Sequence, residues 1–275
     1  MQDWMLAEFA AWLKGQERAA GTIEKYLRDI RAFFRWLDGR TLCDEAAAAW
    51  KRSLLDEGYV PCTINSMLAA LHSYCSFAKL PVRVRFLKIQ RRPFRAPERE
   101  LTQPEFCKLL TAARQQGTRR LALIIETIAA TGIRVSELRY ITLDAVYAGR
   151  ADVQLKGKIR TILLPKKLRE RLRAYAKAQK ITCGEIFLTA GGVGISRKQI
   201  WAELKRLCVR AHVAPEKVFP HNLRHLFAVA FYKASRDIVK LADVLGHTSI
   251  ETTRLYLTSS GKEHLRLLDR LQLVE

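Results

Sequence analysis

Six side chains of the types that act on phosphate groups are spread over residues 134–256. They are Arg134, a lysine in the segment Lys156-Gly157-Lys158, His221, Arg224, His247 and Tyr256. Guanidinium groups match phosphate oxygens bidentately, and histidines donate hydrogen bonds or move protons near neutral pH. A tyrosine can attack as a nucleophile, while a lysine can protonate a leaving alkoxide. Since the sequence offers no carboxylate cluster for magnesium, the set predicts phosphoryl transfer without metal or cofactor, stabilised by fixed positive charge.

The patterns around Arg134, His221 and Arg224 favour side chains that converge on a groove. Arg134 follows the Thr131-Gly132 turn and precedes a new helix. His221 and Arg224 are three residues apart, so they share one face if that segment is helical. The apolar run that follows them, residues 226–231, is expected to be buried. Each residue alone reads as an ordinary surface or core side chain, and only the combination indicates a site.

His247 and Tyr256 follow a break between two predicted helices. Gly246 is a typical helix end and Ser249 a typical helix start, so His247 lies in the corner between them. Backbone N–H groups at such a corner are available to an anion. Tyr256 comes nine residues later, on or just after the second helix. Without its companions it reads as a core tyrosine.

Three segments together resemble the motifs of the tyrosine recombinases, or phage integrase family. They are Thr131–Leu138, His221–His225, and Leu245–His247 followed by Tyr256, and the similarity extends over about residues 101–260. The resemblance implies a site-specific DNA recombinase that exchanges strands without metal or ATP. The chain has no room for the arm-binding domain of larger integrases, so it looks like the compact Xer or mobile-element type.

The resemblance also implies a role for each residue. Arg134 and Arg224 would clamp the scissile phosphate, with His221 and His247 donating hydrogen bonds or moving protons. Tyr256 would form a 3′-phosphotyrosyl bond and release a 5′-hydroxyl, and the 5′-hydroxyl of a second DNA would then attack that bond.

The leaving-group acid is expected on a hairpin, where two lysines compete for the role. The family usually has Gly-Lys-Gly with a longer turn before the next basic residue, and the segment here is shorter. Lys156 aligns best with the family's lysine, and Lys158 is the alternative.

Net charge indicates the partner. The chain has 48 Lys and Arg against 27 Asp and Glu, and residues 101–275 hold 31 of the basic and 15 of the acidic side chains. Such a surplus favours nucleic acid over an anionic membrane or an acidic protein, and a merely soluble basic protein is the alternative. The resemblance implies that the partner is double-stranded DNA with recombination sites. No apolar run reaches the roughly 18 residues of a membrane span, and the first residues lack the basic start of a signal peptide. None of the six cysteines has zinc-finger spacing. A cytoplasmic, nucleoid-associated protein is expected.

A mainly α fold is predicted, with two lobes and a linker. In residues 1–87 the apolar spacing predicts a helix from an N-cap at Thr22 to about Leu37 and a second one after Thr63. Shorter helices at 3–13 and 43–57 complete a bundle, which resembles the family's SAM-like, core-binding DNA-binding domain.

Basic side chains in two places are candidate DNA contacts. One set lies on the polar face of the helix from Thr22, and the other lies in the extended linker 88–100, where prolines exclude a helix. The candidates are Lys25, Arg28, Arg31, Arg35, Arg91, Arg92 and Arg95. For the helix, a solvated face offset by Glu24 and Asp29 is an equally good interpretation.

Residues 101–275 are expected to form the mostly helical catalytic domain with a small antiparallel sheet. Thr102 with Glu105 predicts a capping box, Ser196 with Gln199 another, and an apolar helix is predicted over about 118–130. Residues 152–155 and 159–164 predict a β-hairpin, and residues 144–146 a third strand.

The last residues of the sequence suggest how subunits could associate. Leu265, Leu268 and Leu271 form one stripe of a predicted helix over 262–273. In the family such a helix docks on a neighbouring subunit of a tetramer that holds two DNA sites, and packing within one chain is the alternative.

Two other functions fit part of the pattern, namely a DNA-binding regulator without catalysis and a type IB topoisomerase.

Overall fold

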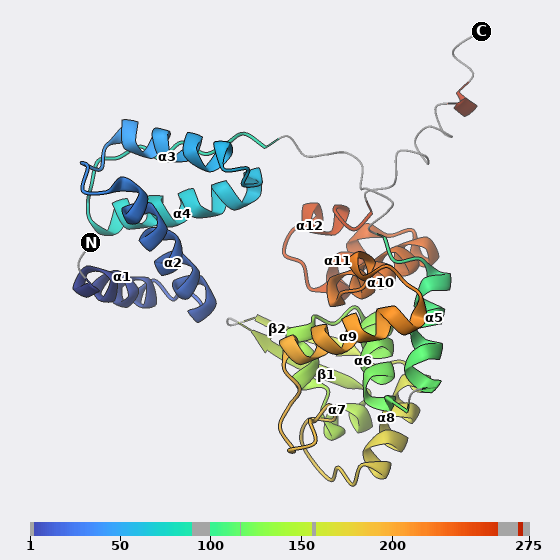
Figure 1. Ribbon diagram of the computed structural model, residues 1–275. Helices are drawn as coiled ribbons and strands as arrows, with labels where there is room; N and C mark the ends of the chain where they lie inside the picture. Colours follow the sequence, from blue (N-terminus) through green and yellow to red (C-terminus); the bar gives the residue numbers. More distant parts are fainter. Residues whose placement is uncertain (1–2, 90–99, 116, 156–157, 258–268, 272–275) are drawn as a thin grey trace. The chain divides into compact units, whose positions relative to one another are not determined.

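The computed structural model describes residues 3–89, 100–115, 117–155, 158–257 and 269–271 (Figure 1). The chain forms two compact units, Met1–Arg92 and Pro93–Glu275. Both are mainly helical, and the described residues contain one two-stranded antiparallel sheet, in the second unit. The predicted fold class is therefore confirmed.

The described residues of the first unit contain four helices. They are α1 (Asp3–Gly15), α2 (Ala20–Leu37), α3 (Asp44–Asp56) and α4 (Pro61–Phe77). Their apolar faces meet in one core whose largest buried side chains are Phe9, Phe33, Trp50 and Tyr74. Edge-to-face ring pairs hold this core together, including Phe33 with Trp50 at 4.8 Å between centroids.

Two predicted helix starts in this unit are wrong. Helix α2 begins two residues before Thr22, and its N-cap Ala19 makes no side-chain hydrogen bond. Helix α4 begins at Pro61, two residues before Thr63. Proline is favoured at the first position of a helix because that position needs no N–H donor, so the proline starts the helix in place of a threonine cap.

The second unit contains more elements. Its helices are α5 (Gln103–Gln115), α6 (Arg119–Thr131), the 3₁₀ turn η2 (Val135–Tyr140), α7 (Leu143–Ala148), α8 (Lys166–Ala178), α9 (Arg197–Ala211), the 3₁₀ turn η3 (Pro215–Lys217), α10 (Pro220–Ser235), α11 (Ile238–Leu245) and α12 (Ile250–Arg254). In this unit α10, α11 and α12 gather at one end and α7 and α8 at the other (Figure 1). Within the described ranges no helix combines the length and hydropathy that a membrane crossing requires.

Helix α6 is the centre of the second unit. Leu121, Ile124, Ile125 and Ile128 are buried, as the apolar run predicts, and the helix contacts α5, α8, α9 and α10. The capping box at Thr102 is confirmed, with the Thr102 N–H donating to Glu105 at 2.8 Å. The capping box at Ser196 is also present.

The sheet consists of β1 (Arg150–Leu155) and β2 (Lys158–Leu163), so the predicted hairpin is confirmed. The predicted third strand at 144–146 is wrong, because this segment lies in α7. The Thr142 hydroxyl accepts a hydrogen bond from the Ala145 N–H at 3.1 Å and caps that helix.

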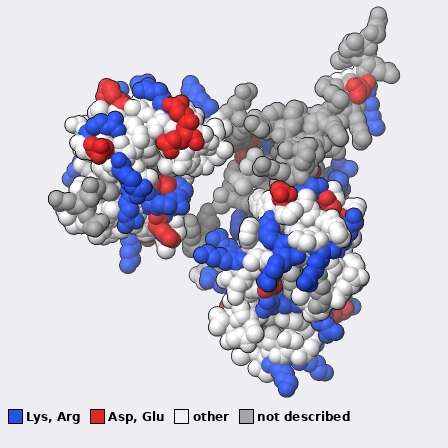
Figure 2. Space-filling view, in the orientation of Figure 1, with Lys and Arg blue, Asp and Glu red and all other residues white. Residues whose placement is uncertain are grey.

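Charge is distributed differently on the two units. Figure 2 shows Lys and Arg spread over the visible face of the second unit with few acidic side chains between them. On the first unit acidic and basic side chains are mixed. This follows the sequence, where residues 1–87 contain 12 basic and 10 acidic side chains.

Candidate active site

A buried arginine connects the motifs that the sequence singled out. Arg224, in the second turn of α10, is only 2% exposed. Its guanidinium donates to the carbonyl oxygens of Gly132 and Leu245, the latter at 2.8 Å. One of its nitrogens also lies 3.0 Å from His247 Nε2. Segments far apart in the sequence are thereby held around one side chain.

The burial of α10 differs from the prediction. In the apolar run 226–231 only Ala228 is fully buried, and Ala230 is exposed. The buried positions lie one turn earlier, at Asn222, Leu223, Arg224 and His225. The buried face of this helix is thus partly polar, which is possible because Arg224 finds carbonyl acceptors there.

His247 is neutral in this environment. Since Arg224 has only donors, His247 Nε2 accepts and its Nδ1–H donates to the Thr253 hydroxyl at 2.9 Å. Burial, followed by the nearby charge of Arg224 and Arg134, lowers the pKa of His247 to about 4. Thr253 is itself fully buried, so it fixes the imidazole ring in place.

Tyr256 lies among three histidine rings. The ring centroids of His221, His247 and His225 are 5.2, 5.5 and 5.8 Å from that of Tyr256. Tyr256 is 8% exposed, two residues beyond α12. Burial lowers the pKa of Arg224, and the adjacent Tyr256 hydroxyl partly opposes this effect. The phenol therefore lies next to the guanidinium within the same chain.

An acidic residue holds two further arginines in the site. Glu137 in η2 is 1% exposed, and its carboxylate accepts from Arg134 and from Arg160 at 2.9 Å each. It also accepts from the Arg134 backbone N–H at 2.9 Å. Arg160, on β2, donates to the same Leu245 carbonyl as Arg224. The hairpin is thus joined to α11 and η2.

Positively charged side chains outnumber negatively charged ones in this cluster. The carboxylate of Glu137 pairs with Arg134 and Arg160, whereas Arg224 binds only neutral backbone carbonyls and His247. Burial lowers the pKa of Arg160 to about 10, and repulsion from Arg224 and Arg134 contributes in the same direction. A bound phosphate would relieve this repulsion, and the guanidinium geometry suits its oxygens.

Two glycines permit the close packing. Gly132 ends α6 with φ +63°, and a Cβ there would lie 2.5 Å from Phe227. Gly246 ends α11 with φ +62°, and a Cβ there would lie 2.1 Å from Arg160. Only glycine meets both demands, a left-handed backbone and a close approach. The predicted helix end at Gly246 is confirmed.

Five of the six predicted site residues come together in this cluster, namely Arg134, His221, Arg224, His247 and Tyr256. Lys156 lies outside the described residues. Sequence reasoning missed the roles of Glu137 and Arg160. The spacing of Glu137 three residues after Arg134 was a usable signal, whereas nothing local marked Arg160. In the described part of the chain no three His, Cys, Asp or Glu side chains form a metal-binding group.

The candidate DNA contacts divide into three groups. Lys25 and Arg28 both bind the buried carboxylate of Asp29, at 2.6 and 3.0 Å. Arg31 and Arg35 are exposed on the same helix, and no hydrogen bond or ion pair of theirs is seen with the described residues. Arg91, Arg92 and Arg95 lie outside the described residues.

The fold and this cluster agree with the comparisons of sequence. Residues 99–263 match the Phage integrase family, and residues 6–80 match the phage integrase N-terminal SAM-like domain. The chain belongs to the phage integrase family.

Individual relatives are similar over nearly the whole chain. Tyrosine recombinase XerA of Thermococcus kodakarensis is 29% identical over 269 residues, covering 95% of this chain and 93% of the relative. Tyrosine recombinase XerD of Xanthomonas campestris pv. campestris is 28% identical over 279 residues, covering 91% and 85%.

Solved structures support the fold. A lambda integrase tetramer bound to a Holliday junction has a TM-score of 0.74 at 19% identity, covering 92% of this chain and 76% of the other. A XerH site-specific recombinase bound to palindromic difH substrate has a TM-score of 0.70 at 21% identity, covering 85% and 75%.

Proposed function

We propose that this protein is a site-specific DNA recombinase that cuts and rejoins strands through Tyr256. The carrying observation is the position of the Tyr256 ring, next to the rings of His221 and His247 and beside the buried guanidinium of Arg224. A binding protein needs positive charge but has no need of a tyrosine enclosed in this way. The relatives named tyrosine recombinases support the same function.

The cleavage step follows from the cluster. The Tyr256 oxygen attacks the phosphorus and forms an O–P bond, while the bond to the 5′-oxygen breaks and its electron pair leaves with that oxygen. His221, the more exposed of the two histidines, takes the phenolic proton. Arg134 and Arg224 bind the non-bridging oxygens, where charge develops in the transition state. The 5′-hydroxyl of a second strand reverses the step and releases Tyr256.

A hairpin lysine protonates the leaving 5′-oxygen in this scheme, and we assign the role to Lys156, with Lys158 as the alternative. A substrate with a bridging 5′-sulfur tests the assignment, because a thiolate leaves without a proton. Lys156→Ala should cleave this substrate at close to the wild-type rate but fail on ordinary DNA. If only Lys158→Ala is rescued, the roles are exchanged.

Residues 1–87 form the proposed core-binding DNA-binding domain, 88–100 a basic linker and 101–275 the catalytic domain. All seven candidate basic residues are retained as DNA contacts. Arg31 and Arg35 are the strongest of them, because Asp29 partly neutralises Lys25 and Arg28.

Recombination further requires two duplexes, and we propose a tetramer on DNA. The solved lambda integrase tetramer on a Holliday junction is consistent with this arrangement. The proposed contact is the segment 262–273, most of which lies outside the described residues. The protein would act in the cytoplasm, at the nucleoid.

A plasmid assay tests the function. The DNA site is first selected from a random duplex library, and two copies are placed on one supercoiled plasmid. A recombinase gives deletion or inversion products that depend on both copies. Relaxation of a plasmid without the site, and no recombinant products, would indicate a topoisomerase. Binding without either product would indicate a regulator.

A further inference from the structure

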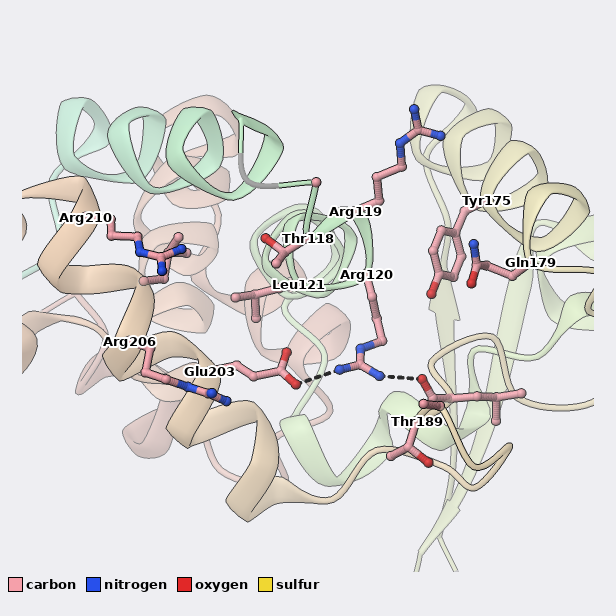
Figure 3. A pocket seen from close by; sticks show the side chains of 14 residues that line it. Thr118, Arg119, Arg120, Leu121, Tyr175, Gln179, Thr189, Glu203, Arg206 and Arg210 are labelled. Atoms are coloured by element: carbon pink, nitrogen blue, oxygen red, sulfur yellow. Dashed lines mark hydrogen bonds and ion pairs between the residues drawn. The ribbon is translucent and has the colours of Figure 1, made fainter.

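A second concentration of arginines lies in the second unit, at the opposite end of α6 from Gly132. It lines a pocket of about 540 Å³ between α6, α8, α9 and residues 188–190 (Figure 3). This volume is typical of small-ligand sites, which span roughly 300–1,000 Å³. Helix α6 has 13 residues and is therefore about 20 Å long. None of the lining residues belongs to the candidate active site.

Arg120 is fixed in the middle of the pocket. Its guanidinium donates to the Leu188 carbonyl and to the Glu203 carboxylate, at 2.6 Å each (Figure 3). Glu203 is the single acidic side chain among the lining residues. Its charge is used by Arg120, so it does not balance the other arginines.

Three more arginines line the pocket with no ion-pair partner among the described residues. These are Arg119 at the start of α6, and Arg206 and Arg210 on α9, and all three are exposed. Arg206 and Arg210 are four residues apart and extend from α9 on the same side (Figure 3). Like charges at this spacing repel each other on a helix. An anion between them would remove that cost.

The remaining walls offer a helix start and a planar surface. Helix α6 begins here, and the Thr118 hydroxyl donates to the Ala113 carbonyl at 2.8 Å and does not cap the helix. A helix start favours anions. On the far wall, the half-buried ring of Tyr175 and the amide of Gln179 lie side by side on α8 (Figure 3).

We propose that this pocket binds a small phosphate-bearing ligand of the nucleoside polyphosphate class. The phosphates lie between Arg206, Arg210 and the start of α6. The base stacks on Tyr175, with the Gln179 amide at its polar edge. A duplex, whose phosphates lie on a convex surface, does not fit a concave pocket of this size. The inference is independent of the proposed recombinase function.

Calorimetric titration with ATP and with inorganic pyrophosphate at 150 mM salt tests the site. The double variant Arg206→Ser/Arg210→Ser should weaken ATP binding by about tenfold or more, since each tenfold is about 1.4 kcal/mol. Glu203→Gln should tighten it, because the opposing carboxylate is removed. Tyr175→Leu should weaken ATP but leave pyrophosphate unchanged. Thermal melts verify that each variant is folded.

A matched control separates a site from general attraction to a basic protein. Arg150→Ser/Lys166→Ser removes the same charge at exposed positions outside the pocket and should leave ATP binding unchanged. Equal weakening in the control overturns the proposal, as does the lack of ATP binding. Binding of octaglutamate in place of ATP, with the same dependence on Arg206 and Arg210, would assign the pocket to an acidic protein segment.

Discussion

At the scale of single residues, Arg224 explains why motifs scattered over the sequence form one site. Its guanidinium binds the Gly132 and Leu245 carbonyls and contacts His247. A buried arginine is tolerated only when its donors find acceptors. Here the backbone carbonyls accept from both terminal nitrogens of the guanidinium, whereas its buried Nε has no hydrogen-bond partner among the described residues. The charge itself therefore remains available to a phosphate. The same contacts position His247 and the adjacent Tyr256.

Replacement of His247 should change how stability depends on pH. The folded-state pKa is about 4, against 6.5 for an ordinary histidine. Between these values the unfolded chain binds a proton that the folded chain does not, so stability falls as pH drops from 6.5 to about 4. In urea unfolding at pH 7.0 and 4.5, His247→Gln should lose less free energy between the two pH values than the wild type. Equal losses would contradict the assigned environment.

Glu137 should be important for stability as well as for the site. Glu137→Ala leaves Arg160 and Arg134 without their carboxylate, and breaking such a buried pair costs about 3–5 kcal/mol. Glu137→Gln should cost less, because it retains the side-chain shape. The exposed Glu170 on α8 serves as a control, with an effect of Glu170→Ala within about 0.5 kcal/mol. Urea unfolding measures all three, and a Glu137→Ala loss as small as the control would refute the role.

At the scale of elements, the ends of α6 and α11 determine the geometry. Gly132 and Gly246 end these helices in left-handed conformation, at points where Phe227 and Arg160 approach the backbone. Each carbonyl that Arg224 binds lies at or next to one of these ends. The helix ends thus place the acceptors for Arg224.

Alanine substitution separates the two reasons for glycine at position 132, the left-handed backbone and the close approach of Phe227. Gly184 has φ +73° but open space around its Cα, so Gly184→Ala should cost only the backbone term of about 1–2 kcal/mol. Gly132→Ala adds overpacking against Phe227, about 1–3 kcal/mol more. Unfolding free energies of the two variants give the comparison directly. Equal costs would mean that the close approach to Phe227 has no energetic effect.

Sequence periodicity predicted the helices and the hairpin well, because their apolar spacing and capping pairs are local. The strand predicted at 144–146 failed, since a cap at Thr142 outweighs the β-prone residues. The prediction of which residues of α10 are buried failed for another reason. Arg224 is buried because it finds acceptors at Gly132 and Leu245, and these residues are distant from it in the sequence. Arg160 was missed for the same reason, as its partners Glu137 and Leu245 are distant in sequence.

At the scale of the whole molecule, the net charge of +21 should dominate binding to DNA. Each phosphate neutralised by Lys or Arg releases counterions, so affinity falls steeply with salt. Residues 1–87 contribute only +2 to this charge, so most of the attraction should come from the rest of the chain.

Removal of single positive charges from α2 should weaken the salt dependence of DNA binding to different extents. Arg31→Ser and Arg35→Ser should each reduce the slope of log affinity against log salt by about 0.9. Arg28→Ser is the matched control and should reduce it less, because Arg28 is bound to Asp29 at 3.0 Å. Fluorescence anisotropy with a duplex site between 50 and 200 mM salt measures the slopes. Equal slopes for all three variants and the wild type would exclude this face as a DNA contact.

Peptide mapping of a trapped complex tests the central claim most directly. A nicked duplex that contains the selected site loses its short 5′-hydroxyl strand after cleavage, which leaves the protein joined to DNA. Trypsin should then release the peptide Leu255–Lys262 with the nucleotide attached at Tyr256, as seen by mass spectrometry. Tyr256→Phe should bind the duplex and form no adduct. An adduct at any other residue, or one that survives in Tyr256→Phe, would contradict the account.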